Sequence, residues 1–163
     1  IENESYLLHP TLCFKISRLG KRVAARFATR YISEAAPAVI IMSGKVASAI
    51  KAGETPRHCD LLFDGAVVVG NFIPMDEDFL IRDHAIELSV GNIGEEAYLK
   101  SEWRLSEINL NTAETLACIS YYNTIKSGDF LLAGTSPEGL SVRPDMAATA
   151  LLDHQPLLKF NVK

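Results

Sequence analysis

The feature that most constrains this 163-residue chain is the length of its apolar runs, which are short and bounded by glycine, proline or turn-forming residues. The longest nearly unbroken run covers residues 35–42, and Pro37 lies inside it. A membrane-spanning helix needs about 20 consecutive apolar residues, whereas buried strands are typically about 4–8 residues long. The sequence therefore predicts a β-rich protein and excludes a helix that spans a bilayer.

Alternation and short β-branched runs place most of the predicted strands. In residues 11–16, Leu12, Phe14 and Ile16 fall on one face, which is typical of a half-buried strand. The apolar runs 37–42 and 65–70 suit strands that are buried on both faces. The remaining predicted strands are a hairpin of residues 85–90 and 95–99 around the turn 91–94, a strand over 128–134, and a pair of strands, 146–152 and 156–162, joined at 153–155.

The longest helical pattern follows the first strand. Val23, Phe27 and Tyr31 recur at i, i+4 and i+8, and this spacing predicts an amphipathic helix over residues 21–33. Three arginines lie on its opposite side. We expect them to form a solvated face rather than a binding patch.

Two further helices are predicted from their end signals. Residues 46–50 favour a short helix that ends near Gly53. Residues 111–124 favour a longer one, with Asn111 as N-cap and Glu114 reaching back to it as in a capping box. Strands outnumber helices, so the predicted class is a β-rich α+β fold.

Composition narrows the compartment and the partners. The formal net charge is −4, from 16 Lys and Arg against 20 Asp and Glu. The densest basic segment, residues 15–30, is interleaved with predicted core residues, so we expect no nucleic-acid partner and no membrane partner. Cys13, Cys59 and Cys118 form no C-x-x-C pair. We therefore expect buried, reduced thiols and a cytoplasmic location.

Local motifs leave three chemical alternatives open. The sequence contains neither the G-x-S-x-G elbow of serine hydrolases nor a G-x-x-x-x-G-K-[ST] phosphate loop. Neighbours on an extended segment point to opposite faces, and isolated surface acids are usually solvated. For each of the three candidates named next, an ordinary structural role is therefore favoured over the chemical one. The candidates are Cys59 beside His58 and Asp60 as a nucleophile, Asp60 with Asp64 as a cation site, and Glu2 with Glu4 as a chelating pair.

The C-terminal third contains a run of residues that resembles a known signature. Residues 126–135 read KSGDFLLAGT, followed by PEGL at 137–140 and RPD at 143–145. This order resembles the Gly-Asp, Gly-Thr and Pro-x-Gly signature of the fumarylacetoacetate hydrolase superfamily. Weaker similarity extends over nearly the whole chain, at residues 16–31, 63–74, 111–114 and 157–162.

The resemblance implies a fold, a metal and a class of reaction. The superfamily has a mixed, β-rich α+β fold, here in one domain of residues 1–163 with the family's N-terminal segment missing. Its members usually form homodimers and act on C–C bonds of 2-oxo or β-diketo acids with a divalent cation, generally Mg²⁺. The cation polarises the substrate oxygens and stabilises the enolate. It is bound by a Glu-x-Glu strand and an Asp on the next strand, and a lysine before a Phe-Asp pair assists.

This sequence departs from the family pattern at each of those chemical positions. Without gaps, Glu-x-Glu falls on His9 and Thr11, the aspartate falls on Ile40, and the lysine falls on Leu61. An aliphatic side chain cannot bind a hard cation, which requires oxygen ligands. The resemblance therefore predicts a degenerate metal site with no metal ligands, no catalytic residues and no cofactor.

The substrate side of the family pattern is partly kept. Gly134 and Thr135 match the positions that line the substrate pocket in relatives. We expect a hydrolase-like pseudoenzyme, a non-catalytic binding or assembly protein that forms a homodimer or pairs with an active relative and binds at most a small 2-oxo acid. The alternative is a hydrolase, decarboxylase or isomerase of C–C bonds that depends on Mg²⁺ or a related divalent cation and uses Glu2, Glu4 or Asp64.

Overall fold

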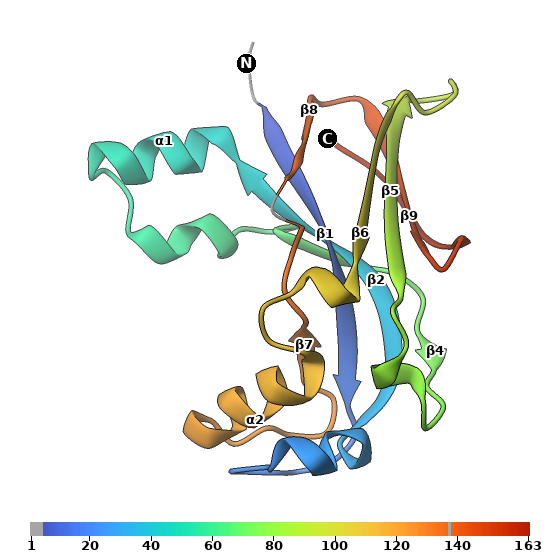
Figure 1. Ribbon diagram of the computed structural model, residues 1–163. Coiled ribbons are helices and arrows are strands. Elements are labelled where there is room, and N and C mark those ends of the chain that lie inside the picture. Colours follow the sequence, from blue (N-terminus) through green and yellow to red (C-terminus); the bar gives the residue numbers. More distant parts are fainter. Residues whose placement is uncertain (1–4, 137) are drawn as a thin grey trace.

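The computed structural model describes residues 5–136 and 138–163, and two antiparallel sheets pack face to face in it (Figure 1). The six-stranded sheet has the order β3-β2-β1-β7, with β4 also pairing with β2 and β8 with β1; the four-stranded sheet has the order β10-β9-β5-β6. The elements are β1 Tyr6–Ile16, η1 Ala25–Arg30, β2 Ile32–Ser43, α1 Gly44–Ala52, η2 Arg57–Leu61, β3 Val67–Val69, β4 Ile73–Pro74, η3 Phe79–Ile81, β5 Ala85–Asn92, β6 Leu99–Arg104, η4 Leu105–Glu107, α2 Thr112–Tyr122, β7 Phe130–Leu132, β8 Leu140–Val142, β9 Met146–Leu152 and β10 Gln155–Asn161.

Strand β1 is the centre of the six-stranded sheet. It pairs with β2 along its whole length on one edge. On the other edge β8 pairs with residues 6–8 and β7 pairs with residues 13–15. Among the described residues, no strand lies beside residues 9–12 on this second edge. Leu12 and Phe14 are buried on the side that faces the other sheet, as predicted. The expectation of a half-buried strand is wrong, however, because Thr11 and Cys13 on the opposite face are fully buried too.

Both sheets contribute to the main core. Phe14 of β1, Ile86 of β5, Trp103 of β6 and Leu152 of β9 are buried together, and Leu116 of α2 closes one end. Burying a large apolar side chain stabilises a fold by about 1.5–3 kcal/mol relative to leaving it in water. This shared core joins the two sheets, and it confirms the predicted β-rich α+β fold.

The predicted helix over residues 21–33 is wrong. Only the short 3₁₀ helix η1 forms there, and β2 follows directly. The N–H of Arg22 donates to the Ser120 carbonyl at 2.7 Å, and the N–H of Val23 donates to the Ser120 hydroxyl at 3.0 Å. Arg22 also has a left-handed φ of 54°, which interrupts a helix. The segment that would begin the helix is thus bonded to α2 instead.

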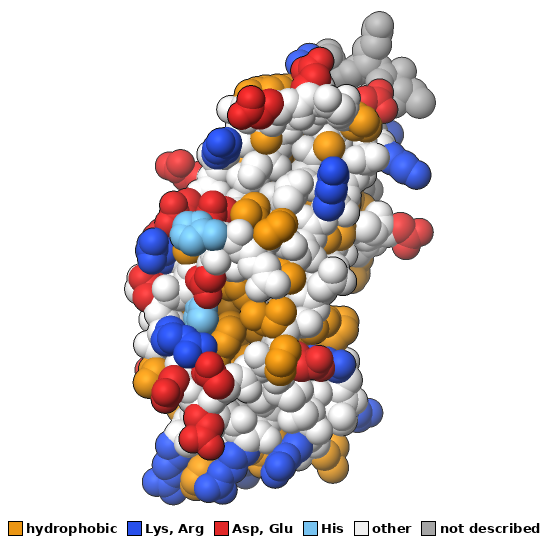
Figure 2. All heavy atoms as spheres, turned by 90° about the vertical axis from the view of Figure 1, so that its right-hand side faces the viewer, with side chains coloured by type: hydrophobic (Ala, Val, Ile, Leu, Met, Phe, Trp, Pro, Cys, Tyr) orange, Lys and Arg blue, Asp and Glu red, His pale blue; other side chains and the backbone are white. Residues whose placement is uncertain are grey.

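The three arginines of this segment nevertheless lie in solvent, as expected. Figure 2 shows Lys and Arg side chains gathered at the lower end of the molecule, where η1 lies in Figure 1. Arg26 and Arg30 each lie over the Phe27 ring at 4.8 Å, and Arg22 lies over the Tyr121 ring at 5.6 Å. Exposed cation–π contacts contribute about 0.5–1 kcal/mol each, so these charges have local structural partners.

The other predicted helices and the β9–β10 hairpin are confirmed. The β5–β6 hairpin also forms, but its second strand, expected over residues 95–99, instead runs over Leu99–Arg104. Helix α1 ends at Gly53. At the start of α2, Asn111 Oδ1 accepts from the Glu114 N–H at 2.9 Å, and the Glu114 carboxylate accepts from the Asn111 N–H at 3.1 Å. The run 65–70 was expected to be a strand buried on both faces, and here the prediction is wrong: only β3 forms, and Val67 is 38% exposed.

The three cysteines differ in burial. Cys13 is buried, Cys59 is partly buried and Cys118 is exposed, and all three are free thiols. The expectation of buried thiols therefore holds fully for Cys13 alone.

Within residues 5–136 and 138–163, the structure contains no helix that is both long enough and apolar enough to cross a membrane.

Candidate functional site

The positions that the family resemblance assigns to the metal ligands lie side by side on one face of the sheet. In the β1–β2 register, His9 pairs with Ile40 and Thr11 pairs with Ala38. Side chains of directly opposed residues share a face, and residues two apart on a strand share that face too. His9, Thr11 and Ile40 therefore lie together, on the side of the sheet opposite the main core.

His9 is bonded to the loop that connects β7 to β8, residues 134–139. Its Nδ1 lies 3.1 Å from the Ser136 carbonyl oxygen. A carbonyl only accepts, so Nδ1 carries the proton and donates. Nε2 is buried and has no hydrogen-bond partner among the described residues. A Cβ built on Gly139 would come within 2.7 Å of Nε2, so the backbone of the loop lies directly against the imidazole ring.

Thr11 holds the other end of the 134–139 loop. Its side chain is fully buried, and Oγ1 donates to the Gly134 carbonyl. The Ser136 N–H donates to the Pro10 carbonyl at 3.2 Å, and the Ser136 hydroxyl donates to the Glu138 carbonyl at 2.9 Å. The polar groups of β1 on this face are thus used to bind the backbone of the loop.

The two residues predicted to line a substrate pocket, Gly134 and Thr135, lie in this loop and are exposed. Gly134 has φ +75°, and a Cβ there would lie 2.7 Å from Ile108 Cγ2. Glycine is therefore required at position 134 for both its backbone conformation and its close packing. The binding role of Gly134 and Thr135 stays a prediction.

The remaining candidates from the sequence do not join this group. Leu61, at the end of η2, is 48% exposed. Asp64 is also exposed and lines a cavity described below. Cys59 is partly buried. Glu2 and Glu4 lie outside the described residues, as do the side chains of His58 and Asp60.

The described residues at these positions do not fit a divalent cation. Mg²⁺ and its relatives prefer several oxygen ligands. His9 offers one imidazole nitrogen, the Thr11 hydroxyl is bonded to the loop, and Ile40 offers a hydrocarbon. In the part of the chain that the structure describes, no group of three or more His, Cys, Asp or Glu side chains could hold a metal ion.

The face of the sheet that carries His9 and Thr11 also carries the thiol of Cys13, which is unreactive. Cys13 follows Thr11 by two residues and is fully buried. Burial raises the pKa of the Cys13 thiol to about 11, because the thiolate loses its hydration. Since the thiolate is the nucleophilic form, Cys13 is unsuited to nucleophilic chemistry at neutral pH.

A second polar cluster lies at the β9–β10 turn, and it serves the fold. His84 Nδ1 lies 2.6 Å from Asp153 Oδ2, and Asp153 Oδ1 accepts from the Ala85 N–H at 2.9 Å. Partial burial would raise the pKa of Asp153, but these hydrogen bonds outweigh it and hold that pKa below its usual value. The His84 ring stacks on Phe79 at 3.8 Å between centroids. The cluster fastens the turn to the start of β5.

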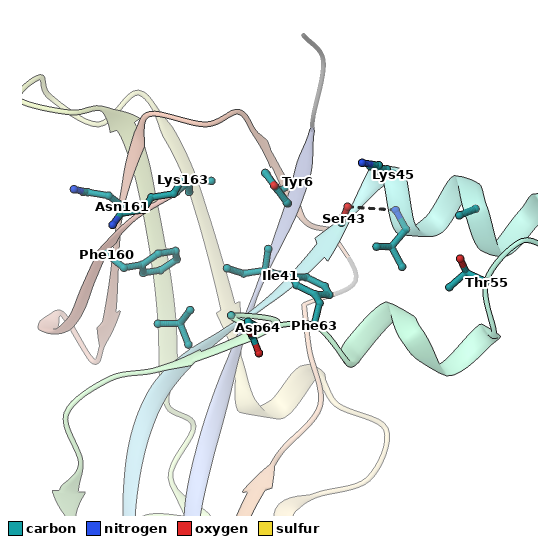
Figure 3. Close-up of a pocket in the computed structure, with 15 residues that line it drawn as sticks. Tyr6, Ile41, Ser43, Lys45, Thr55, Phe63, Asp64, Phe160, Asn161 and Lys163 are labelled. Atoms are coloured by element: carbon teal, nitrogen blue, oxygen red, sulfur yellow. Dashed lines mark hydrogen bonds between the residues drawn. The ribbon is translucent and has the colours of Figure 1, made fainter. Parts of the chain in front are cut away.

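A cavity lies on the other side of the six-stranded sheet from His9, at the end of the sandwich. It has a volume of about 630 Å³ and is bounded by α1, by the end of β10 and by the ends of β1 and β2 (Figure 3). Tyr6 and Ile41 come from the sheet, and Phe63 and Phe160 approach from opposite sides. No motif in the sequence pointed to this cavity, because it arises from the angle at which α1 leaves the sheet.

Comparisons with known proteins identify the fold. No family model matches the sequence, and no curated protein matches it. Among solved structures, a fumarylpyruvate hydrolase from Pseudomonas aeruginosa, in complex with Mn²⁺ and pyruvate, superposes with a TM-score of 0.80 at 19% identity, over 97% of this chain and 66% of that one. A 2-hydroxyhepta-2,4-diene-1,7-dioate isomerase from Mycobacterium marinum gives 0.77 at 19% identity, over 97% and 58%.

A 5-carboxymethyl-2-hydroxymuconate delta-isomerase from Mycobacterium smegmatis gives a TM-score of 0.76 at 18% identity, over 98% of this chain and 59% of that one. This chain thus spans 58–66% of the length of these three proteins. The similarity covers almost every residue of the shorter chain, and it is a similarity of fold.

Proposed function

We propose that this chain, whose fold is similar to that of fumarylacetoacetate hydrolase family proteins, is a non-catalytic binding or assembly protein. One observation carries the proposal. The side chains at the three positions that the resemblance assigns to the metal ligands are a histidine and a threonine that bind loop carbonyls, and an isoleucine.

The chemistry of the family gives this observation its weight. Breaking a C–C bond next to a carbonyl produces an enolate, and a metal-dependent enzyme stabilises that charge with its cation. One imidazole and one hydroxyl, both already bonded to backbone carbonyls, beside an aliphatic side chain supply no such charge. His9 and Thr11 instead fix the 134–139 loop to β1.

The same face supports an assembly role. Leu7, Val67 and Phe130 share the side of the sheet that carries His9 and Ile40, because they occupy equivalent register positions. They are 42%, 38% and 56% exposed. They are spread along the length of β1 rather than contiguous, so a partner that covers all three must extend along the whole face. A second copy of this chain, in a homodimer, is the partner we propose; an active relative is the competing one.

Metal titration tests the proposal directly. We expect isothermal titration with Mg²⁺ and Mn²⁺ to give no site tighter than about 1 mM, the weak end for such ions in proteins. A variant that carries His9→Glu, Thr11→Glu and Ile40→Asp is the comparator. If these positions correspond to the family site, Mn²⁺ raises the melting temperature of this variant and leaves that of the wild type unchanged.

A substrate panel separates the proposal from the enzyme alternative. The proposal predicts no turnover of acylpyruvates or oxaloacetate, with or without Mn²⁺, by the chain including Glu2 and Glu4, whereas the enzyme alternative predicts turnover. Turnover that is lost in a Glu2→Gln, Glu4→Gln or Asp64→Asn variant would overturn the proposal in favour of a displaced active site. Size-exclusion chromatography with light scattering, on wild type and Val67→Lys, tests the homodimer separately.

A further inference from the structure

We infer that the cavity between α1 and the end of β10 is a binding site for a small amphipathic anion, an apolar molecule that carries one carboxylate. This inference stands apart from the proposed function, because the cavity lies on the opposite side of the six-stranded sheet from His9 and Ile40. Its volume of about 630 Å³ falls within the range of about 300–1,000 Å³ that is typical of small-molecule sites.

The walls of the cavity are built for an apolar body. Val46 and Ala49 of α1 line the cavity. Phe63 and Phe160 stand on opposite sides of it, and Ile41 lies between them (Figure 3). Apolar side chains of this kind are normally covered in a folded protein, and burying them stabilises a complex in proportion to the area removed from water. Sites for small ligands characteristically combine such walls with a few polar groups.

None of the nine residues of helix α1 is buried, so its side toward the cavity is not fully covered by the rest of the described chain. Both ends of the helix are nevertheless well formed: the Ser43 hydroxyl accepts from the Val46 N–H at 3.3 Å, and the helix ends at Gly53. An isolated helix this short is marginal in water, and helices in proteins gain most of their stability from packing on an apolar face. A ligand that covers Val46 and Ala49 would supply that packing.

Charge selects the kind of ligand. Lys45 and Lys163 lie at the upper rim on either side of Tyr6, whereas the carboxylate of Asp64 lies at the opposite side (Figure 3). Neither lysine forms an ion pair with another described residue. Two unpaired ammonium groups above an apolar chamber attract a carboxylate whose hydrocarbon part points inward.

Linear fatty acids provide a graded probe. We expect decanoate, titrated calorimetrically below its micellar concentration, to bind the full chain with saturable stoichiometry of about one. Affinity should rise about fourfold per methylene from hexanoate to decanoate, the value of about 0.8 kcal/mol for a buried CH₂. At equal chain length, decanoate should bind more tightly than 1-decanol, and decyltrimethylammonium should bind least.

Matched variants on α1 locate the site. Ala49→Trp fills the cavity and should abolish binding, whereas Ala47→Trp, on the exposed side of the same helix, should leave it unchanged. Lys45→Gln should weaken decanoate by up to about fivefold, the upper end for a partly exposed ion pair, without weakening decanol. Lys51→Gln, away from the rim, should have no effect.

The outcomes separate this inference from the proposed function. Absence of decanoate binding, equal binding by Ala49→Trp, or equal affinity for the cationic probe would each refute the anion site and leave the Mn²⁺ titration untouched. Conversely, a wild type that binds Mn²⁺ and turns over acylpyruvates would refute the non-catalytic proposal, while decanoate binding sensitive to Ala49→Trp would still establish the cavity site.

Discussion

Substituting alanine for Gly139 tests whether the 134–139 loop is packed on His9 as tightly as the structure indicates. The new Cβ would lie 2.7 Å from His9 Nε2 and 2.8 Å from Cε1, whereas non-bonded heavy atoms rest at about 3.5–4.0 Å. The loop or the ring must therefore move by about 1 Å. Overpacking of this kind costs about 1–3 kcal/mol, and displacing the ring also weakens the 3.1 Å hydrogen bond to Ser136, worth about 0.5–1.5 kcal/mol.

We expect Gly139→Ala to lower the free energy of unfolding by about 1–3 kcal/mol. Urea denaturation can be followed by the fluorescence of Trp103, which is the single tryptophan and is buried. His9→Ala removes the ring and makes room for the Cβ, so the double variant should be less destabilised than the sum of the single variants by at least about 1 kcal/mol. A neutral Gly139→Ala, or effects that add within about 0.5 kcal/mol, would refute the packing of the loop on His9.

Two further predictions concern titratable groups. Burial raises the pKa of Cys13 to about 11. A variant with Cys59→Ser and Cys118→Ser, which keeps only Cys13, should therefore react with a thiol reagent at pH 8 only when it unfolds, whereas the wild type should react at once through Cys118. Rapid labelling of Cys13 in the folded variant would contradict this. Since hydrogen bonds, including that from His84, hold the pKa of Asp153 low, ionised Asp153 stabilises the fold above the unfolded pKa near 3.9, and this contribution is lost as pH falls through the folded pKa. Asp153→Asn should therefore show a shallower loss of urea midpoint below about pH 4, and identical slopes would contradict the assignment.

The parts of the fold that the sequence predicted well are those set by local interactions. The capping box of Asn111 and Glu114 lies within four consecutive residues, and it forms as expected. The burial of Leu12, Phe14 and Ile16 on one face needs only a two-residue period. Such signals are contained in a short window, so no knowledge of distant partners is required. The burial of Thr11 and Cys13 on the other face, by contrast, depends on distant parts of the chain.

The helix expected over residues 21–33 does not form, because hydrogen bonds to distant residues determine the conformation of this segment. Its apolar spacing is genuine: Val23 is buried, and Phe27 and Tyr31 pack against the core. However, the backbone of residues 22 and 23 bonds to Ser120, almost a hundred positions later in the chain. Local periodicity carries no information about such a partner.

The candidate site shows the same division. The resemblance aligned His9, Thr11 and Ile40 with positions of one site, and the β1–β2 register indeed brings them together. The bonds of His9 and Thr11 to the 134–139 loop could not be predicted, because each joins residues more than 120 positions apart. The cavity beside α1 was missed altogether, since its volume depends on the angle of a helix rather than on any motif.

Pro10 lies where β1 has no strand beside it, between the parts paired with β8 and β7. The carbonyl of Pro10 accepts from the Ser136 N–H. The N–H and the carbonyl of a strand residue point to the same edge, so an N–H at position 10 would serve this edge as well, but proline has no N–H. A continuous strand from β7 to β8 would meet a missing donor at this point. This edge of β1 therefore cannot form a continuous ladder, and the backbone between β7 and β8 is held instead by single hydrogen bonds to His9, Pro10 and Thr11. Each strand on this edge can thus be lost or shifted without the other, since no shared ladder joins them.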